Sequence, residues 1–387
     1  MNFDSIRCYT DEEISEALLK LTNEKQFMNV LSTVFPLLPK DVLKHRLLGF
    51  RTVLDFQKGT SYPFLKGLED TKTKGVALHG LDKIDTSKAY LYISNHRDII
   101  LDSAFLCLKF IEENLNTVEI AIGDNLLIHT WIEDLVRVNK SFIVRRKFDN
   151  SREILESSRL LSAYIADTIT ERNQSIWIAQ REGRAKDSND RTQESILKML
   201  NMYGENSFIE NLTRLNITPL SISYEYDPCD YLKAKEFQQK RDNPDFKKSP
   251  KDDLTNMGIG VMGYKGHVAY TITECINEKL LQIAGENLPK KEEIAQITAL
   301  IDRQIHANYV IYPNNKIAYD LLTNENQFEK EYSTVERLDF ERYLMLQIEK
   351  IDLEQKDETF LRQKLLEMYA NPLINYLSAI HEKTNEL

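Results

Sequence analysis

The sequence predicts an α/β protein with helical regions at both ends. Between residues 76 and 276, short apolar runs of strand type alternate with helical stretches. The first 70 residues and the stretch after about residue 286 show helical periodicity instead. Strands and helices in alternation are typical of a sheet with helices on its faces. We therefore divide the chain into an N-terminal helical region (1–70), an α/β domain (71–285) and a C-terminal helical region (286–387).

The N-terminal region is predicted to contain two long helices. Acidic residues at 11–13 open a helix that runs to about residue 21. A second helix is predicted over 41–56, where Leu43, Leu47, Phe50 and Leu54 recur at helical spacing. This apolar stripe suits packing on a core and also suits a helix lying in a bilayer interface. We favour core packing, because most stripes of this kind are core.

The later elements follow from apolar runs and helical spacing. Strands are predicted at 89–94, 118–122, 141–144, 175–179, 218–224 and 266–276. Helices are predicted at 102–110, 131–138, 151–169, 192–202, 290–308, 328–352 and 358–380. The polar stretch 231–256 reads as a helix and loop outside the sheet.

Composition and charge exclude several classes of protein. A chain of 387 residues can bury a large core without a disulfide or a metal ion. Its four cysteines lie far apart and form no cluster with histidine, which argues against a zinc site and fits a reducing compartment. Lys and Arg number 50 against 60 Asp and Glu, a formal net charge of −10. We therefore expect no nucleic-acid partner, and an anion site would have to be a local basic patch.

No membrane-crossing or secretory segment is predicted. The charged N-terminus does not read as a signal peptide. The uncharged stretch 28–39 near the start has 12 residues and two prolines, whereas a spanning helix needs about 20 apolar residues. If the protein meets a membrane, we expect it to lie on the surface.

The first segment whose residues could carry out catalysis follows the strand 89–94. It contains Asn95, His96 and Arg97, then Asp98 and Asp102. The carboxyl ends of strands are where α/β sheets place ligand chemistry. A histidine there can act as a general base, and a nearby carboxylate can fix its tautomer. A hydrogen-bonded surface histidine would produce the same pattern.

The second segment is a local basic stretch in an acidic chain. Gly123 and Asn125 precede it, and residues 137–147 carry five basic side chains and no acid. Arg145 and Arg146 follow an apolar strand, so at least one should project from the strand end, where arginine can bind phosphate with two hydrogen bonds. A solvated run of charges is the alternative.

Two further segments are weak when taken alone. Arg181, Glu182, Gly183 and Arg184 follow the strand 175–179, and the glycine permits a tight turn or a close approach of ligand. Residues 217–226 form an apolar strand with a proline near its start and a Tyr-Glu pair near its end. Each of these also fits an ordinary turn or core strand.

Together the four segments resemble the glycerolipid acyltransferase superfamily, in particular the bacterial glycerol-3-phosphate and 1-acyl-glycerol-3-phosphate acyltransferase branch. That family carries, in order, Asn-His-Arg with a downstream Asp, Gly-x-Asn-Leu leading to Phe-Phe-Ile-Arg-Arg, Glu-Gly-x-Arg, and Ile-Thr-x-x-Pro-x-x-Ile-x-Tyr-Glu. The matching positions here are Asn95-His96-Arg97 with Asp102, Gly123 with Asn125 and Leu126, 142–146, Glu182-Gly183-Arg184, Ile217-Thr218 and Tyr224-Glu225. The resemblance covers about residues 76–276.

The resemblance implies a mixed, largely parallel sheet flanked by helices and an enzyme of phospholipid biosynthesis. Such an enzyme moves a fatty acyl group from acyl-CoA or acyl-carrier protein to a hydroxyl of glycerol-3-phosphate or 1-acyl-glycerol-3-phosphate. By similarity, His96 is the general base and Asp102 orients it. The substrate-binding positions would be Arg97, Asn125, Arg145, Arg146, Arg181, Glu182, Gly183 and Arg184. No metal or cofactor is implied beyond the acyl donor as co-substrate.

The resemblance also leaves alternatives open. The acceptor could be the hydroxyl of an aminolipid precursor, or the scaffold could be a non-catalytic lipid- or phosphate-binding protein, or a hydrolase. Lipid acceptors and products favour a cytoplasmic protein that associates peripherally with the cytoplasmic face of the membrane.

Two departures from the family pattern affect the site. Five residues separate His96 from Asp102, where the family usually has four, so either Asp102 or Asp98 could orient the histidine. We favour Asp102 because it opens the following helix. Arg184 follows Gly183 directly, without the intervening residue, so either Arg181 or Arg184 could reach a phosphate.

Overall fold

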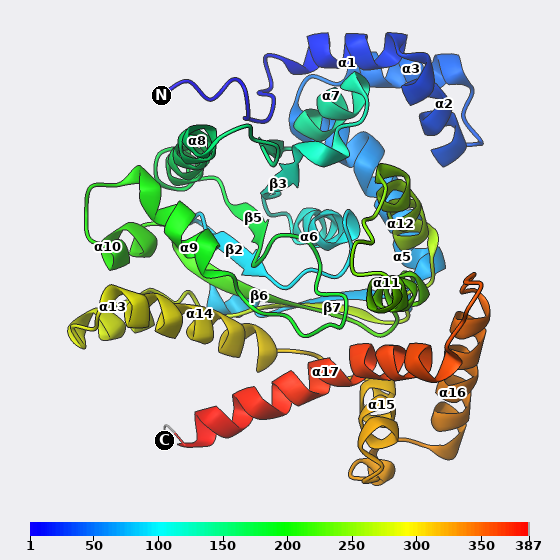
Figure 1. Cartoon of the computed structure of the whole chain (residues 1–387). Coiled ribbons are helices and arrows are strands. Elements are labelled where there is room, and N and C mark those ends of the chain that lie inside the picture. Colours follow the sequence, from blue (N-terminus) through cyan, green and yellow to red (C-terminus); the bar gives the residue numbers. More distant parts are fainter. Residues whose placement is uncertain (386–387) are drawn as a thin grey trace.

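The computed structural model describes residues 1–385 and places a seven-stranded sheet at the centre of the molecule (Figure 1). The strand order is β1-β7-β6-β2-β5-β3-β4. The strands are β1 (Val76–His79), β2 (Leu91–Ser94), β3 (Glu119–Gly123), β4 (Ser141–Val144), β5 (Ile176–Ala179), β6 (Ile217–Tyr224) and β7 (Val268–Ile272).

Five neighbouring strands run in the same direction. β6, β2, β5, β3 and β4 pair in parallel, whereas β7 pairs antiparallel with β6 and parallel with β1. The prediction of an α/β fold with a mixed, largely parallel sheet is therefore confirmed. In this register Ser94 lies opposite Ala179, and Gly123 lies opposite Val144, so four strands end together at one edge.

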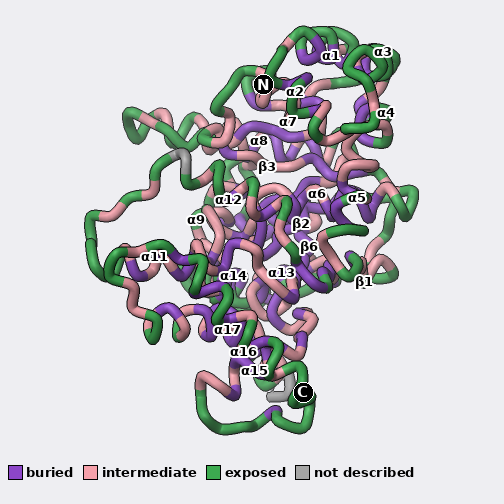
Figure 2. The backbone as a smooth tube through the Cα atoms, turned by 90° about the vertical axis from the view of Figure 1, so that its right-hand side faces the viewer, coloured by how far each residue is buried: buried purple, intermediate pink, exposed green. Residues whose placement is uncertain are grey.

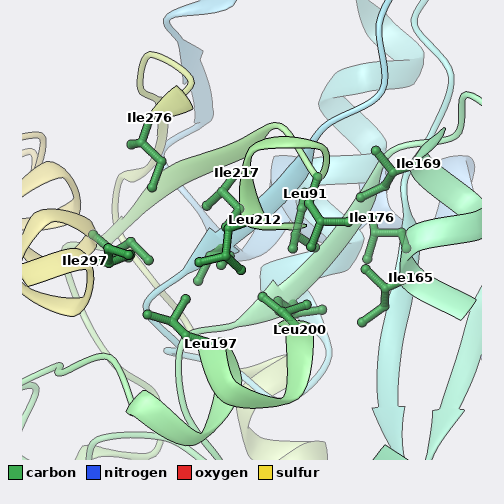
Figure 3. Close-up of a cluster of buried hydrophobic side chains, with 14 of the residues drawn as sticks. Leu91, Ile165, Ile169, Ile176, Leu197, Leu200, Leu212, Ile217, Ile276 and Ile297 are labelled. Carbon is green, nitrogen blue, oxygen red and sulfur yellow. The ribbon is translucent and has the colours of Figure 1, made fainter. Parts of the chain in front are cut away.

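Alternating side chains bury both faces of the sheet. Leu91 and Ile93 point into a cluster with α8 (Ser151–Thr170), α9 (Glu194–Leu200), α10 (Phe208–Thr213), α13 (Asn277–Gly285) and α14 (Lys290–His306). Figure 3 shows part of this cluster. Tyr90 and Tyr92 point to the other face, which α5 (Tyr62–Lys72) and α6 (Leu101–Glu112) cover. Such two-sided burial explains why these strands are nearly continuous apolar runs. It also places α14, from the C-terminal part of the chain, directly on the sheet.

The N-terminal helices pack together above one end of the sheet, beside α7 (Thr130–Val138). They are α1 (Ile14–Asn23), α2 (Lys25–Val34), α3 (Lys40–Gly49) and α4 (Val53–Phe56). The helix predicted over 41–56 is thus two helices, because the Thr52 hydroxyl and the Asp55 carboxylate form a capping box that starts α4. Leu43 and Leu47 are buried in this cluster, as core packing requires, whereas Leu54 is 36% exposed.

The C-terminal helices form a separate apolar cluster with α11 (Asp230–Asp242). They are α15 (Pro313–Thr323), α16 (Thr334–Glu349) and α17 (Glu358–Asn385). A helix α12 (Pro250–Met262) follows α11, so the polar stretch 231–256 contains two helices. Buried residues run through the centre of the molecule, and the outer turns of the terminal helices are largely exposed (Figure 2).

Within residues 1–385, no helix is both long and apolar enough to cross a bilayer. The same part of the chain holds no group of three or more His, Cys, Asp and Glu side chains arranged to bind a metal ion.

Candidate active site

The sheet brings the predicted segments to one edge. β2, β5, β3 and β4 are consecutive neighbours and end at Ser94, Ala179, Gly123 and Val144. Asn95-His96, Arg181-Glu182, Asp124-Asn125 and Arg145-Arg146 therefore follow side by side, although they lie up to 87 residues apart in sequence. This edge, at the carboxyl ends of parallel strands, is where such sheets bind ligands.

Asn95 fixes the turn that carries His96. Its side-chain amide donates to the carbonyl of Ile222 (2.8 Å), and its side-chain oxygen accepts from the amide of Ile222 (2.8 Å). This pair of bonds continues the pairing of β2 with β6 past the end of the strand. The Ser94 hydroxyl donates to the Asn95 carbonyl and accepts from the Trp177 indole (3.0 Å). Since all of these groups are buried and bonded, the turn is rigid.

His96 and Asp102 form a hydrogen-bonded pair. His96 Nδ1 lies 2.8 Å from Asp102 Oδ2, and the amide of Arg97 donates to the same oxygen (2.6 Å). The edge of the Trp177 ring supports the imidazole at 5.8 Å between centroids. The Asp102 side chain is 1% exposed and that of His96 14%, so the carboxylate is internal and the ring remains accessible from outside. The additional residue between them is taken up by the turn before α6, and Asp102 still lies in the first turn of that helix.

Asp98 lies in the same turn but makes different contacts. Its Oδ1 accepts from the amides of Ile100 (2.9 Å) and Leu101 (2.8 Å), which start α6. A Cβ on Gly260 of α12 would stand 2.2 Å from Asp98 Oδ2, so the helix lies directly against this carboxylate. Burial, and then the charge of Asp102, raises the pKa of Asp98. The structure therefore places Asp102, rather than Asp98, against the imidazole.

Arg146 extends from the end of β4 across the end of β3. Its amide donates to Asp124 Oδ1 (3.2 Å), and its Nη1 lies 3.5 Å from Glu182 Oε1 at the end of β5. To reach β5 the side chain crosses Gly123, where a Cβ would stand 2.5 Å from Arg146 Nε and 2.5 Å from Asn125 Oδ1. The guanidinium group thus lies beside the loop after β5, and β5 is the neighbour of β2, the strand that ends just before His96.

The loop after β5 is closed by two hydrogen bonds. The Gln193 amide donates to the Gln180 carbonyl (2.9 Å), and the Glu182 amide donates to Gln193 Oε1 (2.9 Å). Gly183 has φ +68°, a left-handed conformation that favours glycine. The turn thereby holds Glu182 beside Arg146.

The remaining arginines differ in their surroundings. Arg145 is exposed, and Arg181 is half-buried with an Nε that has no hydrogen-bond partner among the described residues. Burial tends to lower the pKa of Arg184, but the charges of Asp227 and Asp98, together with Cys229, raise the pKa overall. Arg184 therefore faces buried acids. Arg97 is buried and its guanidinium group is paired with Asp190.

A family model described as Acyltransferase matches residues 75–210. This stretch of the chain is similar to the acyltransferase family. It contains the first three sequence segments, from Asn95 to Arg184, and strands β1 to β5. The superfamily resemblance stated from the sequence is confirmed for this part of the chain.

Among solved structures, the chain is similar to the crystal structure of the 1-acyl-sn-glycerophosphate acyltransferase PlsC from Thermotoga maritima. The sequences are 13% identical, the TM-score is 0.32, and the match covers 73% of this chain and 96% of that chain. No curated protein matches the chain.

Sequence reasoning missed several residues that support the candidate site. Trp177 lies within a predicted strand, and its indole contacts the His96 ring. Asp190 and Tyr309 contact the Arg97 side chain from distant segments. A buried arginine requires an acidic partner, so an acid near Arg97 could be expected in general. No rule of sequence spacing identifies which of the 60 acidic residues is that partner.

Proposed function

We propose that the protein is a glycerolipid O-acyltransferase of phospholipid biosynthesis. It would move a fatty acyl group from acyl-CoA or acyl-carrier protein to a hydroxyl of glycerol-3-phosphate or 1-acyl-glycerol-3-phosphate. The observation that carries this proposal is the His96–Asp102 pair at the sheet edge where Arg146 leans across Gly123. A base and a phosphate-binding group at the same edge of the sheet are what transfer to a phosphorylated alcohol requires.

The hydrogen bonds support a role for His96 as the general base. The Asp102 oxygen already accepts a hydrogen bond from the Arg97 amide, and an ionised carboxylate only accepts hydrogen bonds. His96 Nδ1 therefore carries a proton, and the Nδ1–H group donates a hydrogen bond to Asp102. Nε2 then has a free lone pair. It takes the proton of the acceptor hydroxyl as the oxygen attacks the thioester carbonyl carbon. The carbon–sulfur bond breaks, and the departing thiolate recovers the proton from the imidazolium, so that an ester and a free thiol form.

The acceptor phosphate is assigned to the arginines at the end of β4. The Arg146 side chain is 35% exposed and lies 3.5 Å from Glu182, so it can form further hydrogen bonds on its open side. Arg145 follows the same strand end and is exposed. Glu182 orients Arg146, and Asn125 borders it. Arg184 is a weaker candidate because buried acids surround it.

Transfer assays with the purified full chain test the proposal. Labelled acyl-CoA and acyl-carrier protein are each combined with glycerol-3-phosphate, 1-acyl-glycerol-3-phosphate and an acylated amino acid, and the products are separated. We expect an ester of one glycerol phosphate, and a fall in kcat of about 10²–10⁴-fold in His96→Ala. His79→Ala, at the exposed end of β1, is the matched control and should retain activity.

Three results would count against this function. Release of free fatty acid with every acceptor would indicate a hydrolase. Lipid binding without turnover would indicate a binding protein. Activity of His96→Ala within a few-fold of the wild type would remove His96 as the base.

A further inference from the structure

Arg97 touches the acid–base pair through its backbone. Its amide donates to Asp102 Oδ2 (2.6 Å), the oxygen that also bonds His96 Nδ1. The second carboxylate oxygen, Oδ1, is buried and has no hydrogen-bond partner among the described residues. The orientation of the Asp102 carboxylate thus depends on two bonds to adjacent residues, His96 and Arg97. A shift of the Arg97 backbone would move Asp102 and the imidazole together.

The Arg97 side chain is held in the interior. It is 8% exposed and forms an ion pair with Asp190, which is fully buried. The Tyr309 hydroxyl donates to Asp190 Oδ2 (3.2 Å), and the guanidinium carbon lies 5.9 Å from the centre of the Tyr309 ring. Burial raises the pKa of Asp190, and the charge of Arg97 opposes this effect.

The space beside this pair is too small for substrate. Arg97 and Tyr309 line a cavity of about 30 Å³, whereas ligand pockets hold roughly 300–1,000 Å³. The side chain of Arg97 is therefore placed to hold protein groups rather than the acceptor.

Both partners of Arg97 depend on the chain beyond residues 75–210, the stretch that the family model matches. Tyr309 lies three residues past the end of α14, and Nε2 of His306 in α14 lies 3.0 Å from the Asp190 carbonyl. Burial lowers the pKa of His306 to about 4, so the ring is neutral near pH 7. Because a carbonyl only accepts, Nε2–H donates to Asp190, and Nδ1 accepts from Arg191 (3.4 Å). The segment around Asp190 is thus fixed by the C-terminal part of the protein.

We propose that Arg97 is a positioning residue, and that Asp190 and Tyr309 hold it so that its backbone keeps Asp102 against His96. The C-terminal region then completes the active site without touching substrate. The expected effect on the rate of acyl transfer rests on the proposed function. The expected effect on the placement of Asp102 and His96 rests on the hydrogen bonds alone.

The chain contains a chemically matched control for this network. At the opposite end of β3, the Tyr164 hydroxyl donates to Glu119 Oε2 (2.5 Å). Arg172 forms an ion pair with Glu119 (2.8 Å), and the guanidinium carbon of Arg172 lies 5.1 Å from the centre of the Tyr164 ring. This is again a tyrosine, a buried carboxylate and an arginine, but it lies away from the catalytic edge. Tyr309→Phe and Tyr164→Phe therefore remove comparable hydroxyl groups. Arg97→Lys and Arg172→Lys each remove a guanidinium group paired with a buried carboxylate, with Arg97 8% exposed and Arg172 39% exposed.

Kinetics of the four variants separate positioning from binding and from general stability. A displacement of about 1 Å can cost 10²-fold in rate, so we expect Tyr309→Phe to lower kcat by at least about 10-fold. Its KM for donor and acceptor should stay within about two-fold of the wild type. Arg97→Lys should fall further, and both control variants should keep the wild-type kcat. If Arg97→Lys does not fold, Tyr309→Phe alone decides the question.

A measurement without turnover keeps the inference distinct from the proposed function. The hydrogen-bonded Nδ1 proton of His96 is followed by NMR and assigned by its absence in His96→Ala. We expect it to exchange with water at least about 10-fold faster in Tyr309→Phe than in Tyr164→Phe. If the wild type transfers no acyl group, the function is wrong and this exchange rate still tests the positioning. Equal exchange and equal kcat in Tyr309→Phe and Tyr164→Phe would overturn it, as would a raised acceptor KM with unchanged kcat.

Discussion

The two candidate carboxylates near His96 can be separated by single substitutions. In Asp102→Asn the amide oxygen must occupy the Oδ2 position, because two donors, His96 Nδ1–H and the Arg97 amide, point at it. The hydrogen bond to the imidazolium then lacks a charged acceptor. Bonds to charged groups contribute about 1.5–3 kcal/mol and neutral ones about 0.5–1.5 kcal/mol, a difference of about 1–2 kcal/mol. This difference corresponds to a fall in kcat of about 5- to 30-fold.

The matched variant is Asp98→Asn. Asparagine still presents an oxygen to the amides of Ile100 and Leu101, and it caps helices about as well as aspartate. We expect its kcat to stay within about two-fold of the wild type. The assay is steady-state transfer at saturating donor and acceptor, with circular dichroism to show that each variant is folded. A larger loss in Asp98→Asn than in Asp102→Asn would show that the assignment of the orienting carboxylate is wrong.

Two further substitutions test other parts of the structure. Gly123 has φ −72°, so alanine fits its backbone, but the new Cβ would push Arg146 aside. Gly123→Ala should therefore raise the acceptor KM by about 10-fold. Gly67→Ala is the control and should leave KM unchanged, because a Cβ added at Gly67 meets no atom within 4 Å. Equal KM values in both variants would show that Arg146 does not bind the acceptor. Burial lowers the pKa of His306 to about 4, whereas the unfolded chain protonates it near 6.5, so stability is lost as the pH falls from about 6.5 to 4. The loss in the free energy of unfolding approaches about 3 kcal/mol. Urea unfolding should show that this free energy falls less over the same pH range in His306→Gln than in the wild type. An equal fall in both proteins would show that His306 is not buried in its neutral form.

The local parts of the fold could be predicted from sequence. Apolar runs located most strands, and the strand at 141–144 has the bounds that were predicted. Their carboxyl ends then indicated which side chains share an edge, because parallel strands align in one direction. The approach of Arg146 to Glu182 could not be predicted, since it requires the strand order β5-β3-β4 and the space above Gly123.

Elements governed by tertiary contacts were missed or misjudged. Residues 41–56 have continuous helical spacing, but the capping box at Thr52 ends that continuity. α13 and α15 were not predicted. His306 and Tyr309 were not predicted to support the site, because a sequence pattern cannot show which buried charge they contact.

The position of β6 matters for anyone who wishes to express a shorter form of the protein. A fragment that stops at residue 210 would lack β6, which pairs with β2 along Leu91–Ser94 and bonds the Asn95 amide. β2 would become an exposed edge strand with apolar side chains and unpaired backbone groups, and such edge strands pair with strands of neighbouring molecules. We would expect that fragment to precipitate, so a minimal expression clone must extend well past the stretch that the family pattern recognises.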